Sequence, residues 1–160
     1  MNRRTEVLRI PAAIAAASLL AYVLGFAFTS LFPGYLPKIG GLWSAISAVV
    51  VTQLTVEETR SSASLRVLGS GIGALTSAVY LSLLPFQPLG MALAIFATVL
   101  ICSALKVPSH GRLAAITVMV VMVTASLDPS LNPLVNALLR FVESCIGTAV
   151  ALIGVQFWRR

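Results

Sequence analysis

The sequence is built from long apolar stretches that contain no charged residue. The first runs from Ile10 to Pro37, and others follow, separated by short segments with proline, glycine or charged side chains. With 58% hydrophobic and 10% charged residues, this chain of 160 residues is far more apolar than a soluble domain. A bilayer core requires about 20 apolar residues per helix, which leaves room for about six spans. We therefore expect an all-α integral membrane protein, a single transmembrane domain over residues 1–160 without a soluble domain.

Breaks in the apolar pattern predict where each span ends. Two prolines and several glycines in Pro33–Gly41 end the first span, and the charged residues from Glu57 to Arg66 indicate a loop after the second. A signal peptide is the alternative interpretation of the N-terminus, but the apolar run exceeds the usual core of about 7–15 residues. The predicted spans are about Ile10–Phe32, Leu42–Val56, Leu65–Leu84, Leu89–Val107, Leu113–Leu127 and Leu134–Trp158.

Lysine and arginine are distributed unevenly between alternate loops, which predicts the orientation. If the N-terminus is cytoplasmic, only Lys38 and Arg140 fall outside. The residues then expected inside are Arg3, Arg4, Arg9, Arg60, Arg66, Lys106, Arg112, Arg159 and Arg160. We expect a multi-pass protein of the cell inner (plasma) membrane with both termini in the cytoplasm. The net charge of +6 then reflects lipid headgroups and orientation rather than nucleic-acid binding.

The third and sixth predicted spans begin with related sequences. Both carry arginine followed by serine, isoleucine and glycine at the same spacing, which gives five matched positions. All except the isoleucines have the spacing i, i+3, i+4, i+7 that places them on one helix face. The matched positions are Arg66 and Arg140, Gly69 and Glu143, Ser70 and Ser144, Ile72 and Ile146, and Gly73 and Gly147. In an apolar chain, these two faces are the first place to look for a binding function.

The second and fifth predicted spans also match, which predicts an internal repeat. Positions 41, 45, 46, 50 and 51 recur seventy residues later with the same residue types, and Ser47 is matched by Thr117. Each copy contains three spans, about 10–84 and about 89–158. An odd number of spans makes the two copies enter the membrane from opposite sides, so we expect two inverted three-helix repeats. The first and fourth spans show no residue match.

The stretch from Trp43 through the second span to the glycine-rich third span resembles a known family signature. It is similar to the fusaric acid resistance and aromatic acid exporter group of bacterial inner-membrane proteins. The residues that carry the resemblance are Trp43, Gln53, Thr55, Arg66, Gly69, Ser70 and Gly73. The resemblance implies efflux of aromatic or other organic acids, and a more distant similarity to plant aluminium-activated malate channels implies a dimeric anion pathway. Two departures are the missing cytoplasmic domain and Leu54, where proline is common in the family.

The predicted substrate-binding residues follow from the matched faces. Arg66 and Arg140 would bind the carboxylate, Gln53 would orient it, and Ser70 and Ser144 lie beside the arginines on the matched faces. Glu143 would act as counter-ion or proton-coupling partner of Arg140. Structural alternatives stay open: Arg66 as an orientation signal, Arg140 neutralised by Glu143 while its side chain reaches outward, and Gln53 in an interhelical hydrogen bond.

Other residues are predicted to have structural roles. Gly69, Gly73 and Gly147 favour close helix packing, and His110 is expected to be a solvated loop residue. Cys102 and Cys145 lie in apolar spans without a metal-site pattern, so neither a metal nor a cofactor is expected, and no catalytic arrangement indicates an enzyme. The predicted function is a homodimeric transporter or anion conduit for organic acids. The alternative is a non-transporting membrane scaffold, or a subunit that needs a separate soluble partner.

Overall fold

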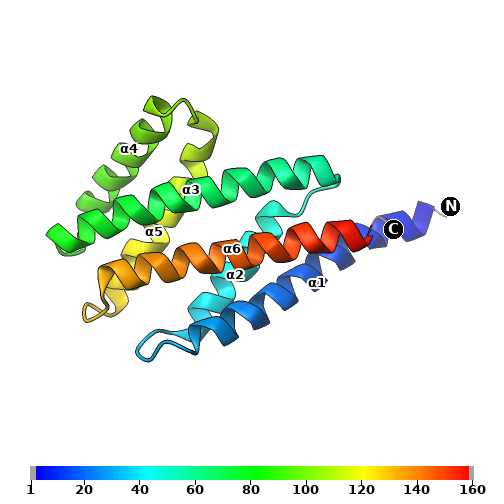
Figure 1. The fold of residues 1–160 in the computed structure, drawn as a ribbon, viewed down its shortest axis with the longest axis horizontal. Coiled ribbons are helices and arrows are strands. Elements are labelled where there is room, and N and C mark those ends of the chain that lie inside the picture. The colour runs from blue at the N-terminus through cyan, green and yellow to red at the C-terminus, as the bar shows by residue number, and fades with distance from the viewer. Residues whose placement is uncertain (1–2, 159–160) are drawn as a thin grey trace. The chain divides into compact units, whose positions relative to one another are not determined.

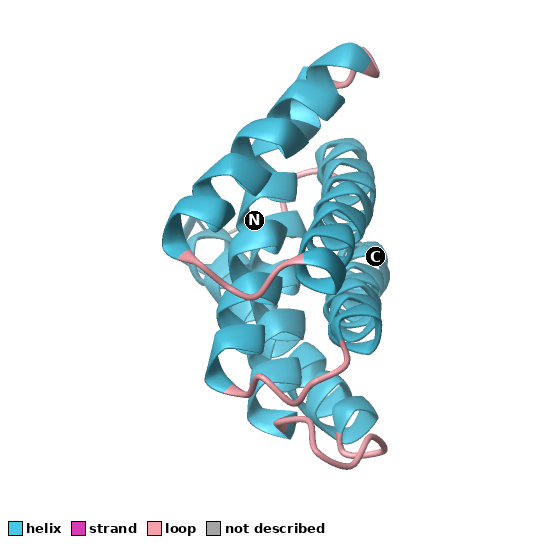
Figure 2. Cartoon of the chain, turned by 90° about the vertical axis from the view of Figure 1, so that its left-hand side faces the viewer, coloured by secondary structure: helices cyan, strands magenta, loops and turns pink. Residues whose placement is uncertain are grey.

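A computed structural model describes the backbone of residues 3–158 and the side chains of residues 10–157. Over this range the chain forms six α-helices and one short 3₁₀ turn, and no strand (Figures 1 and 2). The elements are α1 (Arg3–Thr29), α2 (Pro37–Val51), α3 (Val56–Leu83), α4 (Pro88–Ala104), η1 (Pro108–His110), α5 (Gly111–Leu127) and α6 (Pro133–Trp158). The prediction of an all-helical chain with six main helices is confirmed.

Four stretches of the described chain are long and apolar enough to cross a membrane. They are Ile10–Thr29, Val56–Leu83, Pro108–Leu127 and Pro133–Phe157. Helices α2 and α4 are also apolar, but they contain 15 and 17 residues, fewer than the about 20 that a bilayer core requires. The chain is therefore a multi-pass membrane protein. That α2 and α4 cross the membrane fully, and that both termini lie in the cytoplasm, are still predictions. Arg159 and Arg160, which were used for the predicted orientation, lie outside the described residues.

Helix α3 begins earlier than the sequence predicted. The residues expected to form a loop after the second span, Glu57, Glu58 and Arg60, belong to its first turns. The Thr55 N–H donates to Glu58 Oε2 and the Glu58 N–H donates to Thr55 Oγ1, both at 3.1 Å. This reciprocal capping box satisfies backbone donors at the start of the helix, and the acidic side chains suit the positive end of the helix dipole. The loop prediction was wrong because these charges start a helix.

Proline residues start helices in this chain as well as interrupt them. Helices α2, α4 and α6 begin at Pro37, Pro88 and Pro133, where the missing N–H costs nothing and the fixed φ angle suits the helix. At the last of these, Asn132 Oδ1 accepts hydrogen bonds from the N–H groups of Leu134 and Val135 (3.0 and 3.2 Å). Helix α2 begins at Pro37, whereas the predicted second span begins at Leu42, so the predicted start is about one turn too late.

The helices form two compact units, and neither coincides with a predicted sequence repeat. Unit 1 comprises residues 1–64 and 143–160, and unit 2 comprises residues 65–142. Unit 1 therefore contains α1, α2, the first turns of α3 and the C-terminal part of α6, whereas unit 2 contains most of α3, α4, η1, α5 and the N-terminal part of α6. Each unit thus takes its second-span helix from one predicted repeat and its third-span helix from the other.

Small residues dominate the core of each unit. In unit 1, Ala21, Ala48 and Val150 form one buried cluster, and Val51, Ala63 and Ala151 form another. In unit 2 the corresponding clusters are Ala74, Ala78, Val121 and Ala137, and Ala94, Val118 and Met122. Side chains of this size bring helix backbones close together, which is how helices associate in a membrane.

Candidate functional site

In unit 1, α2 and α6 approach each other until their backbones touch. The Oγ atoms of Ser47 and Ser144 lie 3.2 Å apart, and the Ser44 hydroxyl donates to the backbone carbonyl of Glu143 at 3.0 Å. A Cβ atom added at Gly147 would collide with the Ser44 carbonyl oxygen and lie 2.8 Å from Ser47 Cβ. Only glycine fits at this position of the crossing.

In unit 2, α3 and α5 make a contact of the same kind. Thr117 Oγ1 donates to Ser70 Oγ at 3.3 Å. A Cβ atom added at Gly73 would collide with the Ala114 carbonyl oxygen and lie 2.9 Å from Thr117 Cβ. One turn earlier, an added Cβ at Gly69 would lie 3.0 Å from the His110 carbonyl oxygen. Gly69 and Gly73 thus face α5 directly.

The two crossings use residues that the sequence match pairs with each other. Each contact joins a second-span helix to a third-span helix through a hydroxyl pair and a glycine seated on a backbone carbonyl. The corresponding positions are Ser47 and Thr117, Ser144 and Ser70, Gly147 and Gly73, and Ser44 and Ala114. The similarity seen in the sequence therefore has a physical counterpart within each unit.

Glu143 lies at the end of the unit 1 crossing, where it is completely buried. The Thr29 hydroxyl of α1 donates to Glu143 Oε1 at 2.6 Å, the short distance typical of a hydrogen bond to a carboxylate. A Cβ atom at Gly40 of α2 would lie 2.6 Å from the same oxygen and would collide with Thr29 Oγ1. Sequence reasoning missed Thr29 and Gly40, because nothing local connects them to a residue on α6.

At the equivalent place in unit 2, the glycine lies on the other helix of the pair. The position matched to Gly40 is His110, and the position matched to Glu143 is Gly69. His110 is 9% exposed, and its Nδ1 lies 3.3 Å from Ser109 Oγ. The prediction of a solvated His110 was wrong: η1 and the start of α5 pack its backbone against α3. Aligning the repeats at Gly41 and Gly111 would have drawn attention to it.

Both candidate arginines are buried. Arg66 on α3 is 0% exposed and Arg140 on α6 is 2% exposed. An arginine that served only to set orientation would lie among lipid headgroups, and one that reached outward would expose its guanidinium. Burial of this degree means that neither side chain reaches outward, and neutralisation of Arg140 by Glu143, which is also buried, stays open as a structural role.

Gln53 lies in a different environment from the one predicted. It is exposed in the connection between α2 and α3. Its Nε2 donates to the carbonyl of Val50, near the end of α2, at 3.1 Å, and its backbone N–H donates to Thr59 Oγ1 in the first turn of α3 at 3.1 Å. The structure therefore places Gln53 just after the end of α2.

A comparison with protein families matches residues 14–154 to the fusaric acid resistance protein-like family. The match covers most of the chain. This chain belongs to that family. Searches of curated proteins and of solved structures found no match. Membership confirms the resemblance read from the sequence, and it is consistent with a membrane transporter rather than an enzyme.

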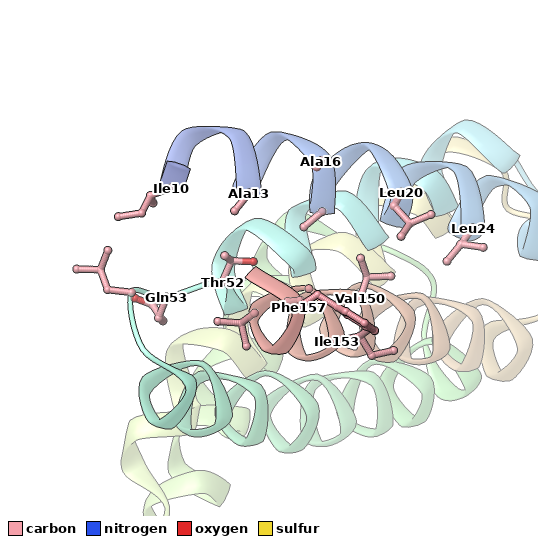
Figure 3. A pocket seen from close by; sticks show the side chains of 15 residues that line it. Ile10, Ala13, Ala16, Leu20, Leu24, Thr52, Gln53, Val150, Ile153 and Phe157 are labelled. Carbon is pink, nitrogen blue, oxygen red and sulfur yellow. The ribbon is translucent and has the colours of Figure 1, made fainter. Parts of the chain in front are cut away.

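This member of the fusaric acid resistance protein-like family also contains a large cavity that the sequence did not indicate. The cavity lies within unit 1 and has a volume of about 700 Å³. It is lined by α1, by the C-terminal half of α6 and by the segment Thr52–Leu54 (Figure 3). Gln53 is thus the one predicted substrate-binding residue that lines it.

Metal binding is not indicated by the side chains of this family member that the structure describes. Among them, no three His, Cys, Asp or Glu residues are close enough to hold a metal ion. Cys102 is buried and Cys145 is half-buried, and each is a free thiol.

Proposed function

We propose that this chain transports aromatic or other organic carboxylic acids across the cytoplasmic membrane, as an exporter or an anion conduit. The observation that carries the proposal is the burial of Arg66 and Arg140 in α3 and α6. Ionisable side chains are costly at membrane depth and mark ion and substrate pathways. A guanidinium offers a planar pair of donors that matches a carboxylate, so an organic anion is the substrate class that these residues favour.

The matched faces supply the other roles in the proposal. The hydroxyls of Ser70 and Ser144 lie one turn from the arginines and can donate hydrogen bonds to the anion. Glu143 acts as counter-ion or carries the proton that couples to transport. Gln53, at the end of α2, meets the anion where it enters or leaves.

The proposed architecture is a pair of inverted three-helix repeats with both termini in the cytoplasm, assembled as a homodimer. The matched crossings support it, because inverted repeats are expected to bury equivalent surfaces. Cysteines introduced at Lys38 and Ser130 are expected to react with an impermeant maleimide in intact cells, whereas cysteines at Ser62 and Ser109 are not. The opposite labelling would reject the orientation, and labelling at all four would reject six spans.

The transport proposal is tested by uptake of radiolabelled aromatic and dicarboxylic acids into liposomes that contain the purified protein. We expect Arg66→Lys and Arg140→Lys to keep the charge but lose the bidentate geometry. Loss of such a contact costs about 1.5–3 kcal/mol, so flux falls about ten- to a hundredfold. The double change Arg140→Gln with Glu143→Gln is expected to lose flux as well.

Arg112→Lys is the matched control, because Arg112 is exposed at the start of α5. All variants are compared at equal abundance and with equal melting temperatures. Flux like that of the parent in the Arg66 and Arg140 variants would show that these arginines are structural. No flux of any acid in the parent would reject the transport proposal itself.

A further inference from the structure

His110 is a buried polar residue to which the proposed function assigns no role. It is the only histidine of the chain, and it is 9% exposed. Its Nδ1 lies 3.3 Å from Ser109 Oγ, whereas its Nε2 has no hydrogen-bond partner among the side chains and backbone of residues 10–157. Buried polar atoms in folded proteins are nearly always hydrogen-bonded. Nε2 is therefore available to a molecule that binds beside it.

The backbone around His110 is held from three directions. Its N–H donates to the Val107 carbonyl at 3.1 Å, which closes η1. Its carbonyl oxygen lies against α3, where a Cβ atom added at Gly69 would be 3.0 Å away. The next residue, Gly111, faces α4, where an added Cβ would lie 3.5 Å from Val99 Cγ1. The base of the imidazole side chain is therefore fixed in position before any ligand binds, as a precise binding site requires.

Arg66 lies at the same end of the α3–α5 crossing as His110. A Cβ atom added at Gly73 would collide with the Ala114 carbonyl oxygen. Four residues earlier on both helices, one added at Gly69 would meet the His110 carbonyl oxygen, so α3 and α5 run parallel here. Arg66 stands three residues before Gly69 on the same face of α3 and is completely buried. The register therefore places Arg66 level with η1, where His110 lies.

Unit 2, which comprises residues 65–142, contains four basic residues and one acidic residue. The basic residues are Arg66, Lys106, Arg112 and Arg140, and the acidic residue is Asp128. Lys106 and Arg112 flank η1 and are exposed. Asp128 follows the opposite end of α5, about 27 Å from His110 at 1.5 Å per residue. Unit 2 therefore supplies no carboxylate to the end of the crossing where His110 lies.

Unit 1 does supply a carboxylate at the equivalent end of its own crossing. The Glu143 side chain is completely buried there and accepts a hydrogen bond from the Thr29 hydroxyl at 2.6 Å. The matched position of α3 is Gly69, so unit 2 lacks this carboxylate. One crossing thus ends in an acid of the chain, and the other ends in basic and hydrogen-bond-donating groups. The ligand complementary to the second end is the carboxylate of another molecule.

We propose that His110 binds the carboxylate of the organic acid together with Arg66, at the end of the α3–α5 crossing in unit 2. The proposal rests on the proposed function, which assigns Arg66 to the same carboxylate. The Ser109 hydroxyl donates to Nδ1, so the proton lies on Nε2, and the Nε2–H donates to a carboxylate oxygen. A carboxylate accepts about four hydrogen bonds, so the Arg66 guanidinium and His110 bond to it at the same time.

The single histidine allows a direct test in the full chain, purified with a tag that contains no histidine. The imidazole is labelled with ¹⁵N, and its two nitrogen signals are followed by NMR in detergent micelles. Benzoate and benzyl alcohol are the probes, because they share the ring and differ in the carboxylate. We expect benzoate to shift the Nε2 signal in a saturable way and benzyl alcohol to leave it unchanged. Arg66→Lys should require about ten- to a hundredfold more benzoate for the same shift.

Variants of His110 measure its contribution by equilibrium dialysis of radiolabelled benzoate. His110→Ala removes the donor and should weaken binding about ten- to a hundredfold, as expected for a hydrogen bond to a charged group. His110→Gln keeps an N–H donor at a similar reach and should recover most of the affinity. Cys102→Ala on α4 is the control, because Cys102 is buried close to Gly111 and offers no comparable donor. It should bind benzoate like the parent.

Four results would overturn the proposal. Benzoate that binds to the parent without shifting the imidazole signals would place the carboxylate elsewhere, and the transport proposal would stand. Equal shifts by benzyl alcohol would show contact with the ring rather than with the carboxylate. Unchanged affinity in His110→Ala would remove its role; if that variant does not fold, the signals of the parent decide. A parent that binds no benzoate would reject the site as well, and flux of the other acids would decide the transport proposal separately.

Discussion

The crossings of α2 with α6 and of α3 with α5 have the same backbone contact and different polar ends. Each places a glycine on a carbonyl oxygen and a hydroxyl beside a hydroxyl. At the end of the first crossing a carboxylate from Glu143 enters over Gly40, whereas at the end of the second Gly69 lies against His110. The requirement for close approach fixes the small residues. The polar group at the end is free to differ.

The difference shows how a repeated unit can acquire two kinds of site. In unit 1 the missing side chain of Gly40 leaves room for the Glu143 carboxylate, whereas in unit 2 the missing side chain of Gly69 lets the His110 carbonyl approach α3. The carboxylate in unit 1 is bonded to Thr29. In unit 2 the backbone of His110 lies at the equivalent place. The imidazole of His110 is buried, and its Nε2 has no hydrogen-bond partner among the side chains and backbone of residues 10–157.

The largest expected effect tests whether both crossings depend on backbone contact. Gly147→Leu and Gly73→Leu should each destabilise the protein by about 3 kcal/mol or more, at the upper end of overpacking effects, because a backbone carbonyl cannot move aside like a side chain. Melting temperature and monodispersity in detergent measure the loss. Gly154→Leu, on the same helix as Gly147 but facing open space, should melt like the parent. If Gly147→Leu also melts like the parent, the crossing of α2 with α6 is not closely packed.

The next effect tests the carboxylate that distinguishes unit 1. Thr29→Val removes the donor to Glu143 and should cost about 1.5–3 kcal/mol, as expected for a buried hydrogen bond to a charged group. Thr98→Val is the matched control, because Thr98 is equally buried and its hydroxyl bonds to Ala94 of its own helix. Chemical unfolding in mixed micelles gives both values. Equal losses of stability would mean that the hydrogen bond to Glu143 contributes no more than a hydrogen bond within one helix.

A smaller effect tests the equivalence of the hydroxyl pairs. Ser144→Ala and Ser70→Ala remove matched hydroxyls from α6 and α3, and each should cost about 0.5–1.5 kcal/mol, the usual contribution of a hydrogen bond. Because the two contacts are similar at 3.2 and 3.3 Å, the two losses should agree within about 0.5 kcal/mol. A clear inequality in the same unfolding assay would show that the crossings are alike in geometry only.

The smallest effect concerns the loop between α5 and α6. Hydrogen bonds from the Ser130 hydroxyl (2.6 Å) and N–H (2.9 Å) lower the pKa of Asp128 below its usual value. A depressed carboxylate pKa stabilises the folded state above the unfolded pKa, and this stabilisation is lost as pH falls through the folded pKa. Asp128→Asn should therefore lower the melting temperature slightly at neutral pH, and this difference should disappear as the pH falls below the lowered pKa of Asp128. A pH-independent difference would contradict this.

The sequence by itself determined the class of protein, most helix positions and the family. Charge-free apolar runs can satisfy their backbone groups in a membrane only as helices, and proline and glycine mark where helices start and stop. These signals are local, so they can be read without a structure. The same local reading misassigned Glu57 and Glu58, since charge near a span indicates a loop and a helix start equally well.

Only the tertiary structure decided which helix faces meet. Thr29 and Glu143 are 114 positions apart, and nothing in either segment indicates the other. Three further features likewise depend on the packing of distant segments. They are the pairing of α6 with α2 and of α3 with α5, the burial of His110, and the cavity beside α1. The physical reason is that helix formation follows from the solvent and from each segment's own residues. The environment of a side chain depends instead on the surface that another helix brings to it.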